Sequence, residues 1–91
     1  MLESNNIKRS RLVLVVDDYE INRDALGVIL EDDYDVMYAE NGQEALDLMH
    51  EHADDLSIVL LDLIMPVLDG FEVLEAVRAD EELRSIPIIT T

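Results

Sequence analysis

Two short runs of apolar, mostly β-branched residues constrain the fold of this chain most. Leu12–Val16 is apolar throughout, and Leu56–Leu61 is interrupted only by Ser57. Strands that are buried on both faces have such runs, because helices cover both sides of a parallel sheet. The two runs therefore predict the central strands of an α/β fold.

The segments around these runs alternate between helical and extended patterns. Strands are predicted over Tyr34–Ala39 and from Ile86 to Ile89. Residues 20–31 carry apolar side chains at helical spacing, namely Ile21, Ala25, Leu26, Ile29 and Leu30. Two further helices are predicted before and after the strand Leu56–Leu61. Strands and helices therefore alternate from the first strand to the fourth. This order is typical of a doubly wound parallel sheet with helices on both faces.

Two pairs of polar residues predict where the second and third helices begin. Asn41 stands three residues before Glu44, and Asp69 three residues before Glu72. This is the spacing of an N-cap residue and the acidic side chain that can reach back to it. The apolar faces expected for these helices are Ala45, Leu46, Met49 and Ala53 in the second, and Phe71, Leu74 and Val77 in the third.

Composition excludes several classes of function. The net charge is −16 with six basic residues, so the chain is a poor candidate for binding nucleic acid, which needs Lys and Arg to neutralise phosphates. Without cysteine it has no disulfide and no thiolate metal site. No apolar run is long enough to span a membrane, and residues 1–10 do not resemble a signal peptide. We expect a cytoplasmic protein with a tail over residues 1–10 and one domain over 11–91.

Three carboxylates follow the two most apolar strands. Asp17 and Asp18 come directly after the first run, and Asp62 comes directly after the third strand. If the strands are neighbours, these side chains meet at the carboxyl edge of the sheet, where ligands bind in such folds. Alternatively, each aspartate caps a helix or forms a turn.

Such a cluster would need a proton or a cation. Two carboxylates about 4 Å apart repel by about 4 kcal/mol at an effective dielectric constant near 20. Hard oxygen ligands suit Mg²⁺, which commonly binds one or two carboxylates together with a substrate phosphate. A carboxylate can also act as a nucleophile towards phosphorus and form an aspartyl phosphate.

The strand-end segments resemble those of a known family. Leu12-Val-Leu-Val-Val-Asp17-Asp18 and Asp62-Leu-Ile-Met-Pro-Val-Leu-Asp69-Gly70 are similar to the first strand and the phosphorylation loop of response-regulator receiver domains. The resemblance covers roughly residues 11–91. It implies the flavodoxin-like receiver fold with strand order 2-1-3-4, and a role in two-component signal transduction.

The resemblance also implies roles for individual residues. Asp62 would accept the phosphoryl group, Asp18 would bind Mg²⁺ directly, and Asp17 would bind it through water. The backbone carbonyl of Ile64 would supply a further oxygen ligand. The residues implied to shape the loop are Met65, Pro66 and Gly70.

The chain departs from the family pattern near its end. The receiver fold has a further strand and helix, and the family's switch Ser or Thr would fall at position 92. Thr90 and Thr91 are out of that register, and the family's fifth-strand lysine is missing, since Lys8 is the only lysine. We therefore expect an incomplete C-terminal part, an exposed fourth strand and self-association through it.

Other polar residues have simpler interpretations. His50 and His52 stand near the end of the second helix, where a cationic side chain interacts favourably with the helix dipole. Asn22 and Arg23 follow the acidic pair on the first helix, near the mouth of the site, and either contact a kinase or lie on an exposed helix face.

Three functions compete for this sequence. The first is a phospho-accepting receiver, not an enzyme in its own right, that is phosphorylated by a sensor histidine kinase or a phosphotransfer protein. The alternative is a receiver-like interaction or dimerisation module that no longer signals by phosphate. A flavodoxin-like cofactor binder is disfavoured, because no glycine-rich phosphate loop follows the first strand.

Overall fold

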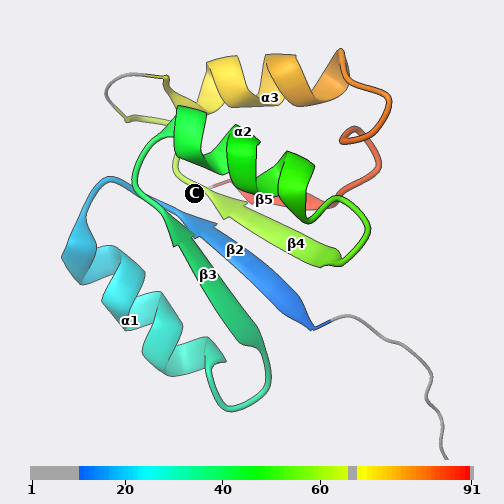
Figure 1. Cartoon of the computed structure of the whole chain (residues 1–91). Coiled ribbons are helices and arrows are strands. Elements are labelled where there is room, and N and C mark those ends of the chain that lie inside the picture. Colours follow the sequence, from blue (N-terminus) through cyan, green and yellow to red (C-terminus); the bar gives the residue numbers. More distant parts are fainter. Residues whose placement is uncertain (1–10, 66–67, 91) are drawn as a thin grey trace, which may run out of the picture.

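The computed structural model describes residues 11–65 and 68–90. Its elements follow the predicted alternation, and their bounds are β2 Leu12–Val16, α1 Glu20–Leu30, β3 Asp35–Ala39, α2 Gly42–Glu51, β4 Leu56–Leu61, α3 Gly70–Arg78 and β5 Ile88–Thr90 (Figure 1). The four strands are parallel, in the order β3-β2-β4-β5. Numbered along the chain, this is the predicted order 2-1-3-4.

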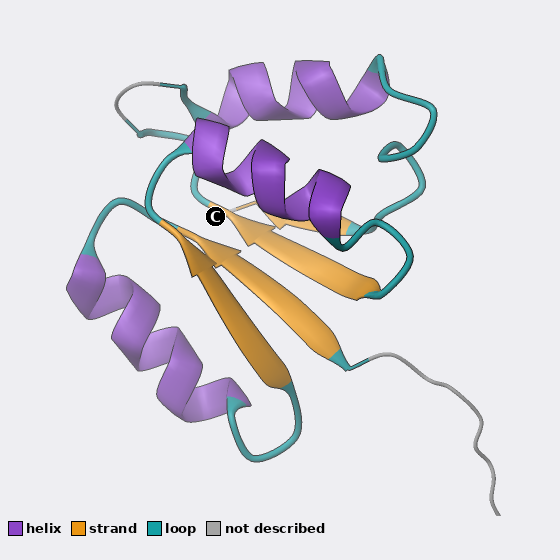
Figure 2. Cartoon of the chain, in the orientation of Figure 1, coloured by secondary structure: helices purple, strands orange, loops and turns teal. Residues whose placement is uncertain are grey.

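The helices lie on both faces of the sheet. Helix α1 covers one face, and α2 and α3 lie side by side over the other (Figure 2). β2 and β4 are the two central strands, and Val16 of β2 is in register with Ala39 of β3 and with Leu61 of β4. The three strands therefore end level with one another, and the residues that follow them meet at one edge of the sheet.

The hydrophobic core lies between the sheet and the pair α2 and α3. Leu14, Val59 and Leu61 project from the strands towards Met49 of α2 and Val73 of α3, and all five are fully buried. Burying one such side chain stabilises the fold by roughly 1.5–3 kcal/mol. This packing fixes the central strands, and with them the edge at which they end.

The two predicted helix caps form. Asp69 accepts a hydrogen bond from the N–H of Glu72 over 2.9 Å, and the Glu72 carboxylate accepts one from the N–H of Asp69 over 3.1 Å. Asn41 caps α2 by accepting from the N–H of Glu44 over 2.9 Å. Glu44 reaches back to the N–H of Glu40 instead of Asn41, so among the described helices only α3 has a complete capping box.

The predicted apolar face of α1 is only partly covered. Leu26 and Leu30 lie half-buried towards the sheet, whereas Ile21 is 81% exposed and Ile29 is 71% exposed. The physical reason is that α1 packs mainly on β2 and β3, which leaves the opposite side of the helix exposed. The apolar surface of α1 is wider than its contact with the sheet.

A second difference concerns α3. Phe71, predicted on the apolar face of this helix, is 59% exposed, whereas Val73 is buried together with Val77. Val73 and Val77 are the buried side chains of α3, and Leu74, as expected, packs partly buried against the core. Phe71 lies on the outer side of the first turn.

The remaining differences are at element boundaries and at positions outside the described residues. β3 begins at Asp35 instead of Tyr34, and β5 begins at Ile88, because Ile86 is buried within the preceding turn. The expectations for residues 1–10, Pro66 and Thr91 fall outside the described residues. Among the described helices, none is both long enough and apolar enough to cross a membrane.

Candidate functional site

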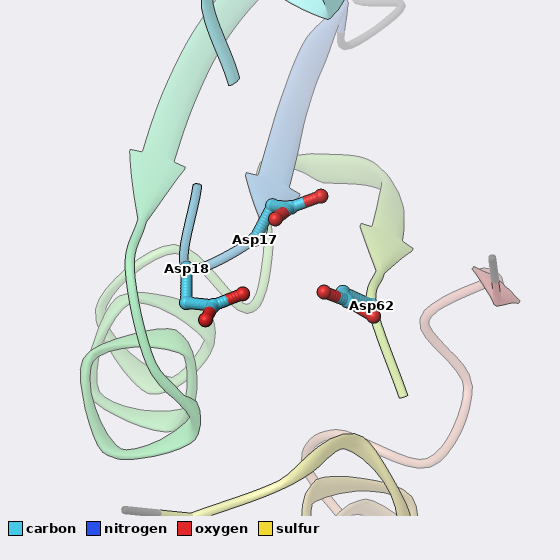
Figure 3. A group of neighbouring side chains, drawn as sticks. All are labelled: Asp17, Asp18 and Asp62. Atoms are coloured by element: carbon cyan, nitrogen blue, oxygen red, sulfur yellow. The ribbon is translucent and has the colours of Figure 1, made fainter. Parts of the chain in front are cut away.

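Three carboxylates meet at the carboxyl edge of the sheet. Asp17, Asp18 and Asp62 each place one oxygen within 4.8 Å of the other two (Figure 3). The strand pairing positions them, since the N–H of Asp62 donates to the carbonyl of Val16 over 3.0 Å. Asp17 is buried, and Asp18 and Asp62 are half-buried. The predicted convergence of the three aspartates is therefore present in the structure.

Asp17 is held by the start of α1. Its Oδ1 accepts a hydrogen bond from the N–H of Tyr19 over 3.0 Å, and its Oδ2 accepts one from Nδ2 of Asn22 over 3.2 Å. Nη1 of Arg23 donates to the carbonyl oxygen of Asp17 over 2.7 Å. Asn22 and Arg23 were expected near the site, as a kinase contact or an exposed helix face. Their hydrogen bonds to Asp17 were not predicted. The sequence feature that could have predicted these hydrogen bonds is the position of both residues on the first helical turn after the acidic pair.

The electrostatics of Asp62 reflect this crowding. Burial raises the pKa of its carboxyl group, and the negative charges of Asp17 and Asp18 raise it further. A hydrogen bond from the N–H of Ile64 to Oδ1, over 3.1 Å, acts in the opposite direction and lowers the pKa. The net shift is upward, so ionised Asp62 is less stable here than in water.

The donor set fits a hard divalent cation. Three carboxylate oxygens converge, and the Asp18 carboxylate accepts no hydrogen bond from any described residue, so it is available for direct coordination. Both oxygens of Asp17 already accept hydrogen bonds from the protein. A cation would relieve the mutual repulsion of the three charges.

The loop after Asp62 is tied to α3. The N–H of Gly70 donates to the carbonyl of Leu63 over 3.0 Å, and a Cβ at Gly70 would overlap the backbone of Asp62 and Leu63. Met65 is buried, whereas Ile64 is exposed. A glycine at position 70 is therefore required for this close approach of two backbone segments.

The histidines do not join the site. At the C-terminal end of α2, Nδ1 of His50 lies 3.0 Å from a Glu82 oxygen, and Nε2 lies 3.2 Å from an Asp80 oxygen. His52 lies 4.0 Å from Glu51. The carboxylate cluster instead lies at the N-terminal end of α2, so the interactions of His50 belong to the opposite edge of the sheet.

Comparison with known proteins identifies the family. A family model described as the response regulator receiver domain matches residues 13–91. The chain belongs to the response-regulator receiver family. The polar-differentiation response regulator DivK of Brucella anthropi is 40% identical over 78 residues, which are 85% of this chain and 62% of that relative. The chain thus spans less than two thirds of the length of this relative.

Solved receiver structures share the fold. The N-terminal domain of a response regulator receiver protein from Methanoculleus marisnigri JR1 superposes with a TM-score of 0.80 at 35% identity, covering 87% of this chain and 63% of that one. A response regulator receiver protein from Pseudomonas putida gives a TM-score of 0.82 at 30% identity, covering 93% and 69%. These likenesses confirm the flavodoxin-like receiver fold and the two-component signalling class.

Proposed function

We propose that this receiver accepts a phosphoryl group on Asp62 from a sensor histidine kinase or a phosphotransfer protein. The observation that carries the proposal is the convergence of Asp17, Asp18 and Asp62 within 4.8 Å at the edge where β2 and β4 end. Asp62 is the member of this cluster that begins the loop resembling the family's phosphorylation loop. The proposal assigns residues 11–91 to the receiver unit and residues 1–10 to a tail.

Mg²⁺ is the proposed cofactor. Asp18 and Asp62 would bind it directly, Asp17 would bind it through water, and the carbonyl of Ile64 would supply another oxygen. Bound Mg²⁺ supplies positive charge that offsets the charge on the phosphoryl oxygens and on the three carboxylates. The fit of the donor set described above supports this choice.

The proposed reaction is a phosphoryl transfer between two side chains. A carboxylate oxygen of Asp62 forms a bond to phosphorus while the bond between phosphorus and the donor's imidazole nitrogen breaks. The electron pair of that bond stays on the nitrogen, which takes up a proton. The chain's own residues contribute by position, because Ile64 N–H orients the Asp62 carboxylate and the fixed strand ends hold Asp17 beside it.

The test is the intact mass of the protein after incubation with acetyl phosphate and Mg²⁺. The wild-type chain is expected to gain a single phosphoryl group, and Asp62→Asn is expected to gain none. Asp69→Asn serves as a control, since it changes an aspartate in the same loop that caps α3. An adduct of equal yield on Asp62→Asn would contradict the assignment of Asp62.

The alternative of an interaction module is favoured by a different observation. Ile21, Ala25, Val28 and Ile29 form an uncovered apolar stripe along α1. Such a surface marks an association site. If folded wild-type chain gained no phosphoryl group under conditions that modify another receiver, this alternative would replace the proposal.

A further inference from the structure

Asn22 lies in the first turn of α1, and its side chain turns back towards the carboxylate cluster. Its Nδ2 donates to Oδ2 of Asp17 over 3.2 Å, while the N–H of Tyr19 donates to Oδ1 over 3.0 Å. Both oxygens of the Asp17 carboxylate therefore accept a hydrogen bond. Rotation of that carboxylate away from its present orientation would break at least one of these hydrogen bonds.

The backbone of Asp17 is fixed as well. Nη1 of Arg23 donates to its carbonyl oxygen over 2.7 Å, and its own N–H donates to the carbonyl of Ala39 over 3.1 Å. Asp17 is only 7% exposed. With the main chain held from two sides, the orientation of the carboxylate depends on the two donors from the start of α1, and only Asn22 contributes a side chain.

We propose that Asn22 is a positioning residue of the cation and phosphoryl site, a claim that rests on the proposed function. Its amide keeps the Asp17 carboxylate facing Asp62 and Asp18 when no cation is bound. Without this restraint, repulsion among the three carboxylates favours a rotated Asp17. The site must then be reassembled when a cation binds, and the cost of that reorganisation reduces affinity.

The competing explanation is that Asn22 only stabilises the start of α1. The two explanations predict different results. A structural role lowers the free energy of unfolding and leaves cation affinity unchanged. A positioning role weakens cation binding in a protein that remains folded, and it makes the Asn22 amide sensitive to the cation.

The experiment is a Mg²⁺ titration of the ¹⁵N-labelled 91-residue chain followed by NMR. In wild type, the side-chain NH₂ signals of Asn22 and the backbone N–H of Tyr19 are expected to shift with one shared dissociation constant. Asn22→Ala and the similarly shaped Asn22→Leu are expected to raise that constant about tenfold, the lower end of the effect of removing a group that orients a metal ligand. Urea unfolding of each variant measures stability separately.

Gln43→Ala is the matched control. Gln43 is also an exposed helical amide side chain that donates to a carboxylate, that of Asp47, over 3.1 Å. The interaction lies within α2 and does not touch the cluster, so its loss is expected to leave Mg²⁺ affinity unchanged.

The outcomes separate this inference from the proposed function. If wild type binds Mg²⁺ and is phosphorylated on Asp62, but both Asn22 variants bind Mg²⁺ within twofold of wild type, only the role of Asn22 is refuted. The same conclusion follows if the variants lose stability alone. If the folded wild type neither binds Mg²⁺ nor accepts a phosphoryl group, the proposed function and the proposed role of Asn22 are both refuted.

Discussion

The backbone N–H of Gly42 donates a hydrogen bond to the carbonyl oxygen of Leu68 over 3.0 Å, which ties the first turn of α2 to the loop after Asp62. A Cβ on Gly42 would overlap that carbonyl oxygen and lie 2.7 Å from a methyl carbon of Val73. Neither neighbour is the flexible end of a long side chain. The position therefore requires glycine because two segments distant in sequence approach closely.

Gly42→Ala is expected to lower the free energy of unfolding by about 1–3 kcal/mol, the usual cost of overpacking a filled site. Urea denaturation measures it. Gly27→Ala is the control, because its Cβ would meet the hydroxyl end of Tyr38, which can move. Alanine also gains up to about 1 kcal/mol over glycine inside a helix. A larger loss of stability for Gly27→Ala than for Gly42→Ala would contradict this explanation.

Mg²⁺ is expected to raise the melting temperature of the wild-type chain, because a ligand that binds only the folded state stabilises it. Asp18→Ala is expected to abolish most of this rise, since Asp18 is a proposed direct ligand. Asp32→Ala removes an exposed carboxylate in the turn after α1 and is expected to preserve the rise. The opposite pattern, measured by thermal unfolding with and without Mg²⁺, would mean that the cation binds elsewhere.

Asp62 gives the stability of the metal-free protein a pH dependence with a definite sign. Its pKa is raised by folding, so the folded state binds more protons than the unfolded state between the usual aspartate pKa and the raised value. Asp62 therefore destabilises the fold above the raised pKa, and this penalty disappears as the pH falls through that window. Asp62→Asn is expected to be more stable than wild type at pH 7, with a smaller difference near pH 4.

Urea midpoints of both proteins at the two pH values, with a metal chelator present, test this prediction. Asp54→Asn is the control, because Asp54 is an exposed residue in the turn before β4. A wild type that is more stable than Asp62→Asn at pH 7 without metal would show that the hydrogen bond from Ile64 outweighs burial and repulsion.

The apolar stripe on α1 is expected to cause self-association of this 91-residue chain. Ile21, Val28 and Ile29 are largely exposed, and Ile89 on β5 is 51% exposed. The net charge of −16 opposes association, but physiological salt screens charges over about 8 Å. Light scattering is expected to detect dimers or larger species that increase with salt.

Ile29→Lys is expected to reduce this association, and Gln43→Lys, which adds the same charge on α2, is expected to reduce it much less. A protein that stays monomeric at low and high salt would contradict the prediction. Equal effects of the two lysine substitutions would mean that net charge, and not the stripe, controls association.

The sequence by itself determined the elements whose causes are local. The apolar runs Leu12–Val16 and Leu56–Leu61 gave both central strands with the observed bounds, and the cap at Asp69 forms as its spacing predicts. The position of Asp62 directly after a buried strand was enough to place it at the carboxyl edge of the sheet. These features depend on side-chain periodicity and on groups only three or four residues apart.

Only the tertiary structure decided which surfaces are covered and where polar side chains turn. Ile21 and Phe71 have the spacing of core residues, yet both are exposed, because coverage depends on elements distant in the chain. Asn22 turns towards Asp17, and His50 turns towards Asp80 and Glu82, for the same reason. A side chain near an acidic pair has several possible partners, and the choice among them depends on the packing of α1 against the sheet.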